Sequence, residues 1–168
     1  VVAEAARRFV VENAGVLGID SAQLGPVKAA QVTDELWQVS IPQAVNGVPV
    51  RDSRVALSIN NGNVVVAGTE VWGNASVSTD ARVTAAGALE AGFAHLGGRS
   101  LHDEMVQEAR LEIAPVAPPE HQAGEGFDGP LGKGYAHRLV WTYQFRRSPG
   151  QETWEAMVDA QTGDLIAF

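Results

Sequence analysis

Four histidines are the side chains of this chain best suited to bind a metal ion or to transfer a proton near neutral pH. They are His95, His102, His121 and His137. A zinc protease of the H-E-x-x-H type would place two histidines on one helix, and this motif is absent. His95 and His102 would lie near each other only if one helix ran through both. Gly97-Gly98 predicts a break between them.

His121 is the best placed of the four as a metal ligand, because Glu120 and Glu125 are close to it in the sequence. Zinc sites are usually recognised by a motif of spaced ligands, and none surrounds this histidine. A solvated loop explains the same residues. We therefore predict no metal site in this chain.

Other patterns of catalytic residues are also absent. The chain has no cysteine, which excludes disulfides, thiolate zinc sites and a cysteine nucleophile. Neither a G-x-S-x-G elbow nor a P-loop occurs, and Gly132-Lys133-Gly134 is a lone glycine-rich fragment. Asp103 and Glu104 are adjacent, as is typical of a solvated surface, and Asp159 is expected to cap a turn. We expect no enzymatic activity and no cofactor.

Composition and charge exclude two classes of partner. The 168 residues carry a formal net charge of −8, and Lys28 and Lys133 are the only lysines. Nucleic-acid binding depends on cations that contact phosphates, so we predict no such partner. No apolar run reaches the roughly 18 residues of a membrane span, so we predict no membrane partner. No signal peptide is present either, and the helix-like start at Val1 favours an upstream segment that is missing or was removed.

The first half of the chain predicts a helix followed by an antiparallel meander. Apolar residues at helical spacing favour a helix over residues 1–14, and alternating residues favour strands within 27–72. Asn46-Gly47 and Asn61-Gly62 predict tight hairpin turns, because both residues tolerate positive φ angles. Pro42 lacks a backbone donor and so predicts either an edge strand or a bulge.

The second half predicts a connector, a helix, a strand, a long loop and a closing meander. These are residues 73–83, 85–96, 109–114, 115–134 and 139–168. Thr84 is suited to be the N-cap of the helix. The long loop contains four prolines and five glycines, a composition typical of mobile or functional loops. Each half therefore has one helix and several antiparallel strands.

Four tryptophans fall in the predicted strands or at their ends. They are Trp37, Trp72, Trp141 and Trp154. An exposed row of tryptophans would indicate a platform for a sugar or a peptide. Packing within a sheet is the favoured interpretation.

Two stretches of the chain resemble the propeptides of secreted thermolysin-like and fungalysin-like metalloproteases. Residues 37–69 resemble the FTP domain, in which a glutamine precedes a G-[IV]-P-V hairpin and a hydrophobic strand with an N-G turn. The matching positions are Gln43, Asn46, Gly47, Val48, Pro49 and Val50. The helix start at Thr84 and the closing meander resemble a PepSY domain. Its turn is matched by Asp159, Ala160, Thr162 and Gly163.

The resemblance implies an α+β fold of two small helix-plus-antiparallel-sheet subdomains, with a cystatin-like PepSY half and no catalytic domain. Residues 1–76 would be the FTP-like subdomain and residues 77–168 the PepSY-like subdomain. The resemblance further implies a noncatalytic prosegment that assists the folding of a cognate secreted metalloprotease and inhibits it. The tail Leu165, Ile166, Ala167 and Phe168 would then lie near a processing junction or the protease cleft.

Two alternatives fit the same sequence. The first is a stand-alone secreted protease inhibitor, which an H-E-x-x-H domain downstream of Phe168 would argue against. The second is an extracellular carbohydrate- or peptide-binding module, which exposed tryptophans would support and buried ones would disfavour.

Overall fold

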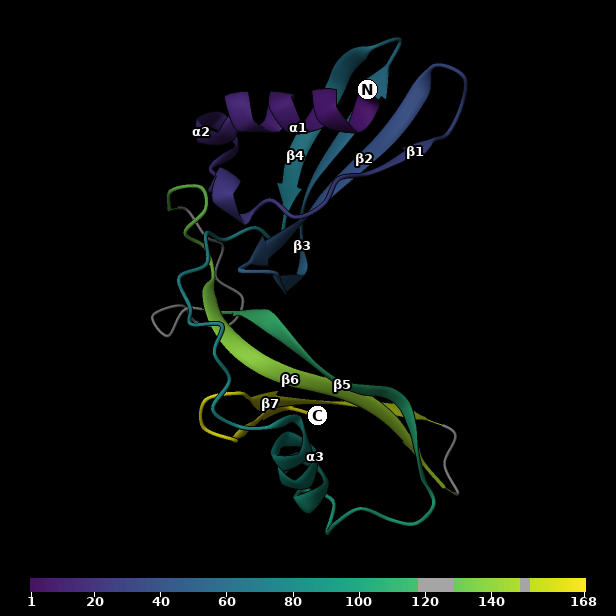
Figure 1. Ribbon diagram of the computed structural model, residues 1–168, viewed down its shortest axis with the longest axis vertical. Coiled ribbons are helices and arrows are strands. Elements are labelled where there is room, and N and C mark those ends of the chain that lie inside the picture. The colour runs from purple at the N-terminus through teal and green to yellow at the C-terminus, as the bar shows by residue number, and fades with distance from the viewer. Residues whose placement is uncertain (118–128, 149–151) are drawn as a thin grey trace. The chain divides into compact units, whose positions relative to one another are not determined.

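The computed structural model describes residues 1–117, 129–148 and 152–168 (Figure 1). The chain separates into two compact units. The first contains Val1–Ser76 and Pro115–His137, and the second contains Val77–Ala114 and Arg138–Phe168. Assignment of residues 1–76 and 77–168 to two family domains stays a prediction.

The first unit contains two α-helices, a 3-10 helix and four antiparallel strands that pair in the order β1-β2-β3-β4. Its elements are α1 (Val2–Glu12), α2 (Ala14–Leu17), η1 (Ser21–Gln23), β1 (Lys28–Gln31), β2 (Leu36–Val45), β3 (Val48–Asn60) and β4 (Asn63–Glu70).

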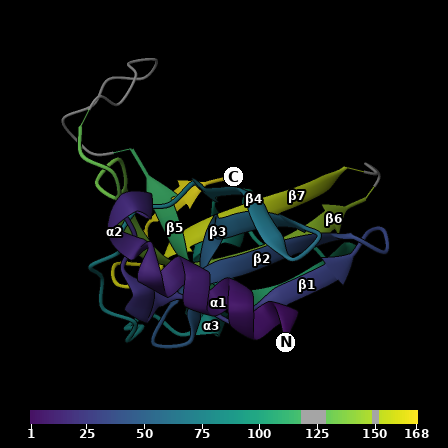
Figure 2. The ribbon, with the colours of Figure 1, turned by 90° about the horizontal axis from the view of Figure 1, so that it is seen from above.

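Helix α1 packs on one face of the β1–β4 sheet, as Figures 1 and 2 show. Ala6 and Val10 are one helical turn apart and both are 0% exposed, so they form the buried stripe of the helix. They share a core with alternate residues of the strands and with a tryptophan. This set is Val39, Ile41, Val55, Leu57, Ile59 and Trp72. The predicted N-terminal helix is confirmed, with its end at Glu12.

Both Asn-Gly pairs form the predicted hairpin turns. Asn46 and Gly47 have φ angles of 49° and 84°, and Asn61 and Gly62 have φ angles of 48° and 77°. Two consecutive positive φ angles are what a tight hairpin needs to match the twist of its strands. The turns connect β2 to β3 and β3 to β4.

Pro42 lies at a bulge and not on an edge strand. Strand β2 pairs with β1 on one side and with β3 on the other, and its register with β3 shifts between Pro42 and Ala44. The carbonyl oxygen of Pro42 accepts a hydrogen bond of 2.7 Å from the amide of Gly25. The bulge leaves Gln43 outside the regular ladder.

The second unit contains one α-helix and four strands that follow each other in the order β5-β6-β7-β8. Its elements are α3 (Ala85–Ala94), β5 (Asp103–Val116), β6 (Ala136–Arg147), β7 (Thr153–Asp159) and β8 (Leu165–Ala167). Thr84 is the N-cap of α3, as predicted, and its hydroxyl oxygen accepts from the Gly87 amide at 3.1 Å.

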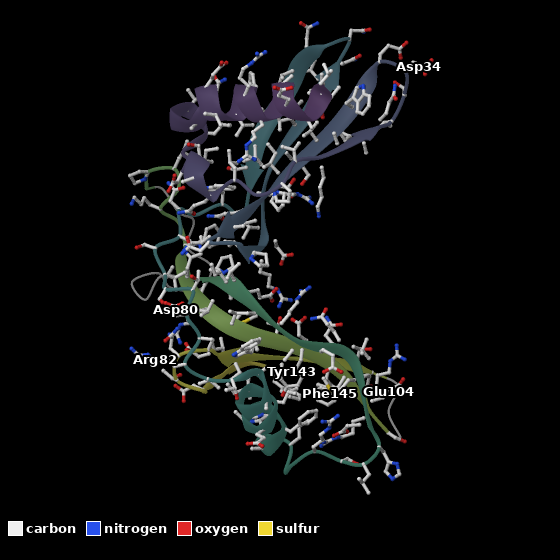
Figure 3. All side chains as sticks on the ribbon, viewed as in Figure 1. Asp34, Asp80, Arg82, Glu104, Tyr143 and Phe145 are labelled. Carbon is white, nitrogen blue, oxygen red and sulfur yellow. The ribbon has the colours of Figure 1, made fainter. Side chains whose placement is uncertain are left out.

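An aromatic cluster joins α3 to its sheet. The ring of Phe93 lies 5.6 Å from that of Tyr143 and 4.7 Å from that of Phe145, measured between centroids. Figure 3 shows Tyr143 and Phe145 directed from β6 toward α3. Such tilted contacts between buried rings are favourable beyond the area that they bury.

The predicted fold class is wrong. The described residues form a large eight-stranded sheet with only three α-helices, and 47% of these residues are strand against 18% helix. Two small helix-plus-sheet α+β subdomains do not describe this arrangement. Part of the error is local, because β5 begins at Asp103 and not near residue 109. The first residues of this strand are mostly polar and charged, so the sequence pattern did not indicate a strand there. None of the helices in the described ranges is long and apolar enough to cross a membrane.

We predict that Gly92→Ala destabilises the second unit. A Cβ atom at this position of α3 would lie 2.0 Å from the hydroxyl oxygen of Tyr143 and 3.0 Å from its ring carbon Cζ. Overpacking of this kind costs about 1–3 kcal/mol, which exceeds the gain of roughly 1 kcal/mol from replacing a helical glycine with alanine. Chemical denaturation measures the free energy of unfolding.

Gly87→Ala is the matched control for this prediction. Gly87 lies in the same helix, and its Cβ would be at an ordinary 3.4 Å from the nearest atoms. We expect this variant to be as stable as the wild type or more stable. Equal stability of both variants would contradict the close packing of α3 on β6.

Candidate functional site

The three described histidines, His95, His102 and His137, do not come together as a metal site. His95 is the C-cap residue of α3, and Gly97 and Gly98 follow it with φ angles of 80° and 107°, so the predicted helix break before His102 is confirmed. His121 and its neighbours Glu120 and Glu125 lie outside the described residues. Within residues 1–117, 129–148 and 152–168, no three His, Cys, Asp or Glu side chains are grouped to hold a metal ion.

Gln43 is the centre of a buried polar network in the first unit. Its side chain is 0% exposed. Its Nε2 donates to the Oε1 of Gln23 at 2.6 Å and to the carbonyl oxygen of Gly73 at 2.8 Å, and its Oε1 accepts from the hydroxyl of Ser53 at 2.5 Å. One side chain thus connects η1, β2, β3 and the segment that follows β4.

Gln23 extends this network to the backbone of Ala75. Its Nε2 donates to the Ala75 carbonyl at 2.9 Å, and its Oε1 accepts from the Ala75 amide at 3.0 Å. Buried amide groups are costly unless they are hydrogen-bonded, so this paired set fixes one path for the chain. The Gln43 network is defined here as Gln23, Gln43 and Ser53 with the backbone of Gly73 and Ala75.

Asn74 anchors the same segment from its other side. Its Oδ1 accepts from the backbone amide of Asp20 at 2.8 Å and from the indole Nε1 of Trp72 at 2.9 Å. Its Nδ2 donates to the Gly18 carbonyl at 3.2 Å. The sequence predicted a plain connector here. Gln23, Ser53 and Asn74 were missed because their partners are distant in the sequence and form no local pattern.

The other FTP-like positions form a hairpin. Asn46 and Gly47 are exposed in the turn, Pro49 is exposed on β3, and Val50 is buried at 4% exposure. Val48 pairs with Val45 across the hairpin. These positions determine the course of the backbone beside Gln43, and only the turn and Pro49 present an exposed surface.

The PepSY-like positions form a capped turn in the second unit. Asp159 is 7% exposed, and its Oδ1 accepts from the amides of Gln161 and Thr162 at 2.8 Å and 3.1 Å. Arg138 lies 3.5 Å from its Oδ2. Gly163 has a φ angle of 83° and donates to the Asp159 carbonyl at 2.9 Å. The capping role expected for Asp159 is therefore confirmed.

Ala160 connects that turn to two other segments. Its amide donates to the Leu139 carbonyl at 2.9 Å, and its carbonyl oxygen accepts from the amides of Arg82 and Val83 at 2.9 Å and 3.0 Å. The residue is 0% exposed. The turn thus holds the segment that leads into α3.

Asp103 and Glu104 do not act as a pair. The carboxylate of Asp103 is fully buried and contacts the guanidinium of Arg147 through two hydrogen bonds of 2.7 Å, while Glu104 is exposed (Figure 3). The bond from Arg147 lowers the pKa of Asp103 below the ordinary aspartate value. This pair holds the start of β5 against the end of β6.

The predicted tail is an edge strand. Leu165–Ala167 is β8, which pairs antiparallel with β7. The ring of Phe168 lies 5.9 Å from that of Phe145 and 5.4 Å from that of Trp154. Entry of this tail into a protease cleft would require β8 to leave the sheet.

The tryptophans do not form one exposed row. Trp72 is 6% exposed, Trp37 packs against the core of the first unit, and the indole of Trp141 donates to the Val83 carbonyl at 2.8 Å. Trp154 is 40% exposed. This disfavours the carbohydrate platform.

An open groove lies on the sheet face of the first unit opposite α1. Its volume is about 390 Å³. It is lined by small and charged residues that include Lys28, Ser40, Arg54, Ala56 and Glu70. The guanidinium of Arg54 contacts the carboxylate of Glu70 at 2.6 Å across β3 and β4.

Comparison with known proteins finds similarity to solved structures but to no protein-family model or curated protein. Among solved structures, the chain is similar to the Bacillus megaterium YpeB C-terminal domain, with 12% identity and a TM-score of 0.41. The match covers 96% of this chain and 60% of that one.

We predict that Gln43→Leu destabilises the first unit by about 2–4 kcal/mol. The substitution leaves the Gly73 carbonyl and the Ser53 hydroxyl buried without their present partner, and each such group costs about 1–3 kcal/mol. Gln38→Leu is the matched control, because Gln38 is exposed on the same strand. Chemical denaturation of both variants measures the difference. A loss below about 0.5 kcal/mol for Gln43→Leu would contradict the network.

We predict that the stability of the chain falls between pH 7 and pH 5 because of His137. Its Nε2 is buried without a partner among the described residues, and burial lowers its pKa. Below about pH 6.5 the unfolded histidine binds a proton that the folded one rejects, so the free energy of unfolding decreases as the pH falls. Denaturation at several pH values measures this slope.

His102→Asn is the control for the pH dependence, because His102 is exposed. We expect His137→Asn to flatten the slope and His102→Asn to retain it. An unchanged slope in His137→Asn would exclude His137 as its source.

Proposed function

We propose that this chain is a noncatalytic regulatory module that binds a secreted zinc metalloprotease, as the prosegment that assists folding of the protease and inhibits it. The cognate catalytic domain is the proposed partner, and the proposed location is extracellular. The chain needs no cofactor for this role.

The observation that carries the proposal is the structural role of the residues behind the resemblance. Gln43 lies at the centre of a buried network in the first unit, and Asp159 caps the turn of the second. Both motifs therefore coincide with the residues on which each unit depends. A chance match would not be expected to include both Gln43 and Asp159.

Folding assistance and inhibition follow from the same binding energy. A module that binds the native surface of a protease, and not its unfolded chain, stabilises the folded protease by mass action. If the bound module also covers the cleft, it inhibits. A stand-alone inhibitor would block the folded enzyme without raising its refolding yield, so the two roles can be separated by experiment.

We predict that the purified chain inhibits a thermolysin-like zinc metalloprotease in proportion to its concentration and raises the yield when that protease refolds from denaturant. Mass spectrometry should find the chain intact in the complex, because a mere competing substrate would be cut. A subtilisin-type serine protease is the control and should remain active. Neither inhibition nor improved refolding, with a metalloprotease shown to be active, would contradict the proposal.

Phe168→Ala tests the tail in the same assay. This substitution removes the ring contacts with Phe145 and Trp154 and should free β8 from the sheet. Stronger inhibition by the variant is expected if the tail enters the cleft. Unchanged inhibition would reject the tail and leave the remainder of the proposal standing.

A further inference from the structure

The open face of the first-unit sheet contains a row of small side chains that crosses the strands. Strand pairing places Ser40 of β2 opposite Ala56 of β3, and Ala56 opposite Gly68 of β4. Lys28 of β1 lies opposite Ser40 and ends the row. Helix α1 packs on the other face, whereas Lys28, Ser40 and Ala56 line the open groove of about 390 Å³.

Longer side chains border this row on both sides. Gln38 and Ser58 form the neighbouring pair on one side, and Arg54 and Glu70 form the neighbouring pair on the other. Gly68 leaves the floor between them open, because a Cβ at this position would meet no atom within 4 Å. The row of small residues and its two borders therefore form a transverse trough across the strands.

The dimensions of the transverse trough fit one extended polypeptide chain. Three gaps between strands separate Lys28 from Gly68, which is roughly 14 Å at the usual strand spacing. An extended peptide covers that length with about four or five residues. The two borders are four residues apart along each strand, or roughly 13 Å between backbones, and their side chains narrow this width to that of a single chain.

Two polar groups of the trough lack a partner among the described residues. The Lys28 ammonium and the Ser40 hydroxyl make no hydrogen bond or ion pair there, although their residues lie opposite each other. Both groups donate hydrogen bonds, and the ammonium carries a positive charge. A carboxylate accepts from such donors and balances that charge, and charge-assisted hydrogen bonds are stronger than neutral ones.

The carboxylates of this face do not neutralise Lys28. Glu70 is engaged by Arg54, whose Nε and Nη2 contact the same oxygen Oε2 at 2.9 Å and 2.6 Å. Asp52, in an adjoining hollow of about 350 Å³, lies 3.7 Å from the guanidinium of Arg51. The trough therefore has a local positive charge, although the chain has a net charge of −8. This local charge favours an anionic group on the occupant.

The other side chains favour a peptide over a sugar or a nucleotide. No aromatic residue of the described chain lines the groove, and Trp37 packs against the core on the α1 face. Sugars and bases commonly stack on aromatic rings. The Gln38 Oε1 accepts from Ser58 at 3.1 Å, and its Nε2 has no partner among the described residues, so it can donate to a peptide carbonyl. The small residues of the floor let a peptide backbone approach the sheet closely.

We propose that the transverse trough binds an extended peptide that carries one carboxylate side chain. The carboxylate contacts Lys28 and Ser40, and small residues of the peptide lie over Ala56 and Gly68. The inference does not rest on the proposed protease, because any protein with such an exposed segment fits the trough. A chain that binds the peptide and inhibits no protease would leave this inference standing.

NMR titration of the isotope-labelled full chain with acetyl-Gly-Ala-Asp-Ala-Gly-amide tests the proposal. We expect chemical-shift changes of backbone amides in β1, β2, β3 and β4 and none in the second unit. The same peptide with Asn in place of Asp should bind about fivefold more weakly, because it loses a surface ion pair. Acetate alone is the probe for a simple anion site and should bind more weakly than the Asp peptide.

Substitutions in the trough test its charge and its shape separately. Lys28→Glu should weaken binding of the Asp peptide about tenfold or more, whereas Lys28→Arg should retain it. Gly68→Val fills the open floor and should also weaken binding. Gly68 is not among the glycines with positive φ, so the strand accepts a valine there. Lys133→Glu is the matched control, because it makes the same charge change at the other lysine of the chain, which is exposed.

Equal affinity for the Asp and Asn peptides, or for the Asp peptide and acetate, would overturn the proposal. Wild-type affinity in Lys28→Glu or in Gly68→Val would overturn it as well, and so would an equal loss in Lys133→Glu. A titration without any chemical-shift change in β1 to β4 would also exclude the site.

Discussion

The buried amide of Gln43 is the interaction on which the first unit depends. The bulge after Pro42 removes this residue from the ladder between β2 and β3, so its side chain is free to turn inward. There it joins a helix turn, two strands and a returning segment through three hydrogen bonds. A glutamine suits this place because its amide both donates and accepts, whereas a carboxylate at this position could not donate to the Gly73 carbonyl or to the Gln23 Oε1.

The second unit is held together by different interactions. A carboxylate, Asp159, caps the turn between β7 and β8, and an aromatic cluster joins α3 to β6. The ion pair of the buried Asp103 carboxylate with the partly exposed Arg147 holds the start of β5 against the end of β6. Each unit thus carries its own core and its own polar anchor. The resemblance to a protease prosegment includes the anchor of each unit, and this is why the proposed function relies on them.

The sequence predicted the local features well and the fold class poorly. The Asn-Gly turns, the Thr84 cap and the break after His95 were predictable because each depends on the conformational preferences of neighbouring residues. The extent of the sheet was not predictable, because the first half of β5 contains mostly polar residues and few apolar ones. Strand formation there depends on pairing with distant segments.

The candidate site was predictable in part. Gln43 and Asp159 were identified from motifs, but their partners Gln23, Ser53 and Arg138 were not, because no local pattern marks a contact between residues far apart in the sequence. The tail was expected near a cleft, and the structure places it as strand β8.

Gln43 is a buried anchor of the first unit, and we expect it to make no contact with the proposed protease partner. The most direct test is NMR of the Gln43 side-chain amide in the free chain and after addition of a thermolysin-like zinc metalloprotease. If Gln43 is a buried anchor, its two Nε2 protons should exchange slowly with solvent. Their chemical shifts should not change when the protease is added. Fast exchange in the free chain, or a direct contact with the protease, would contradict it.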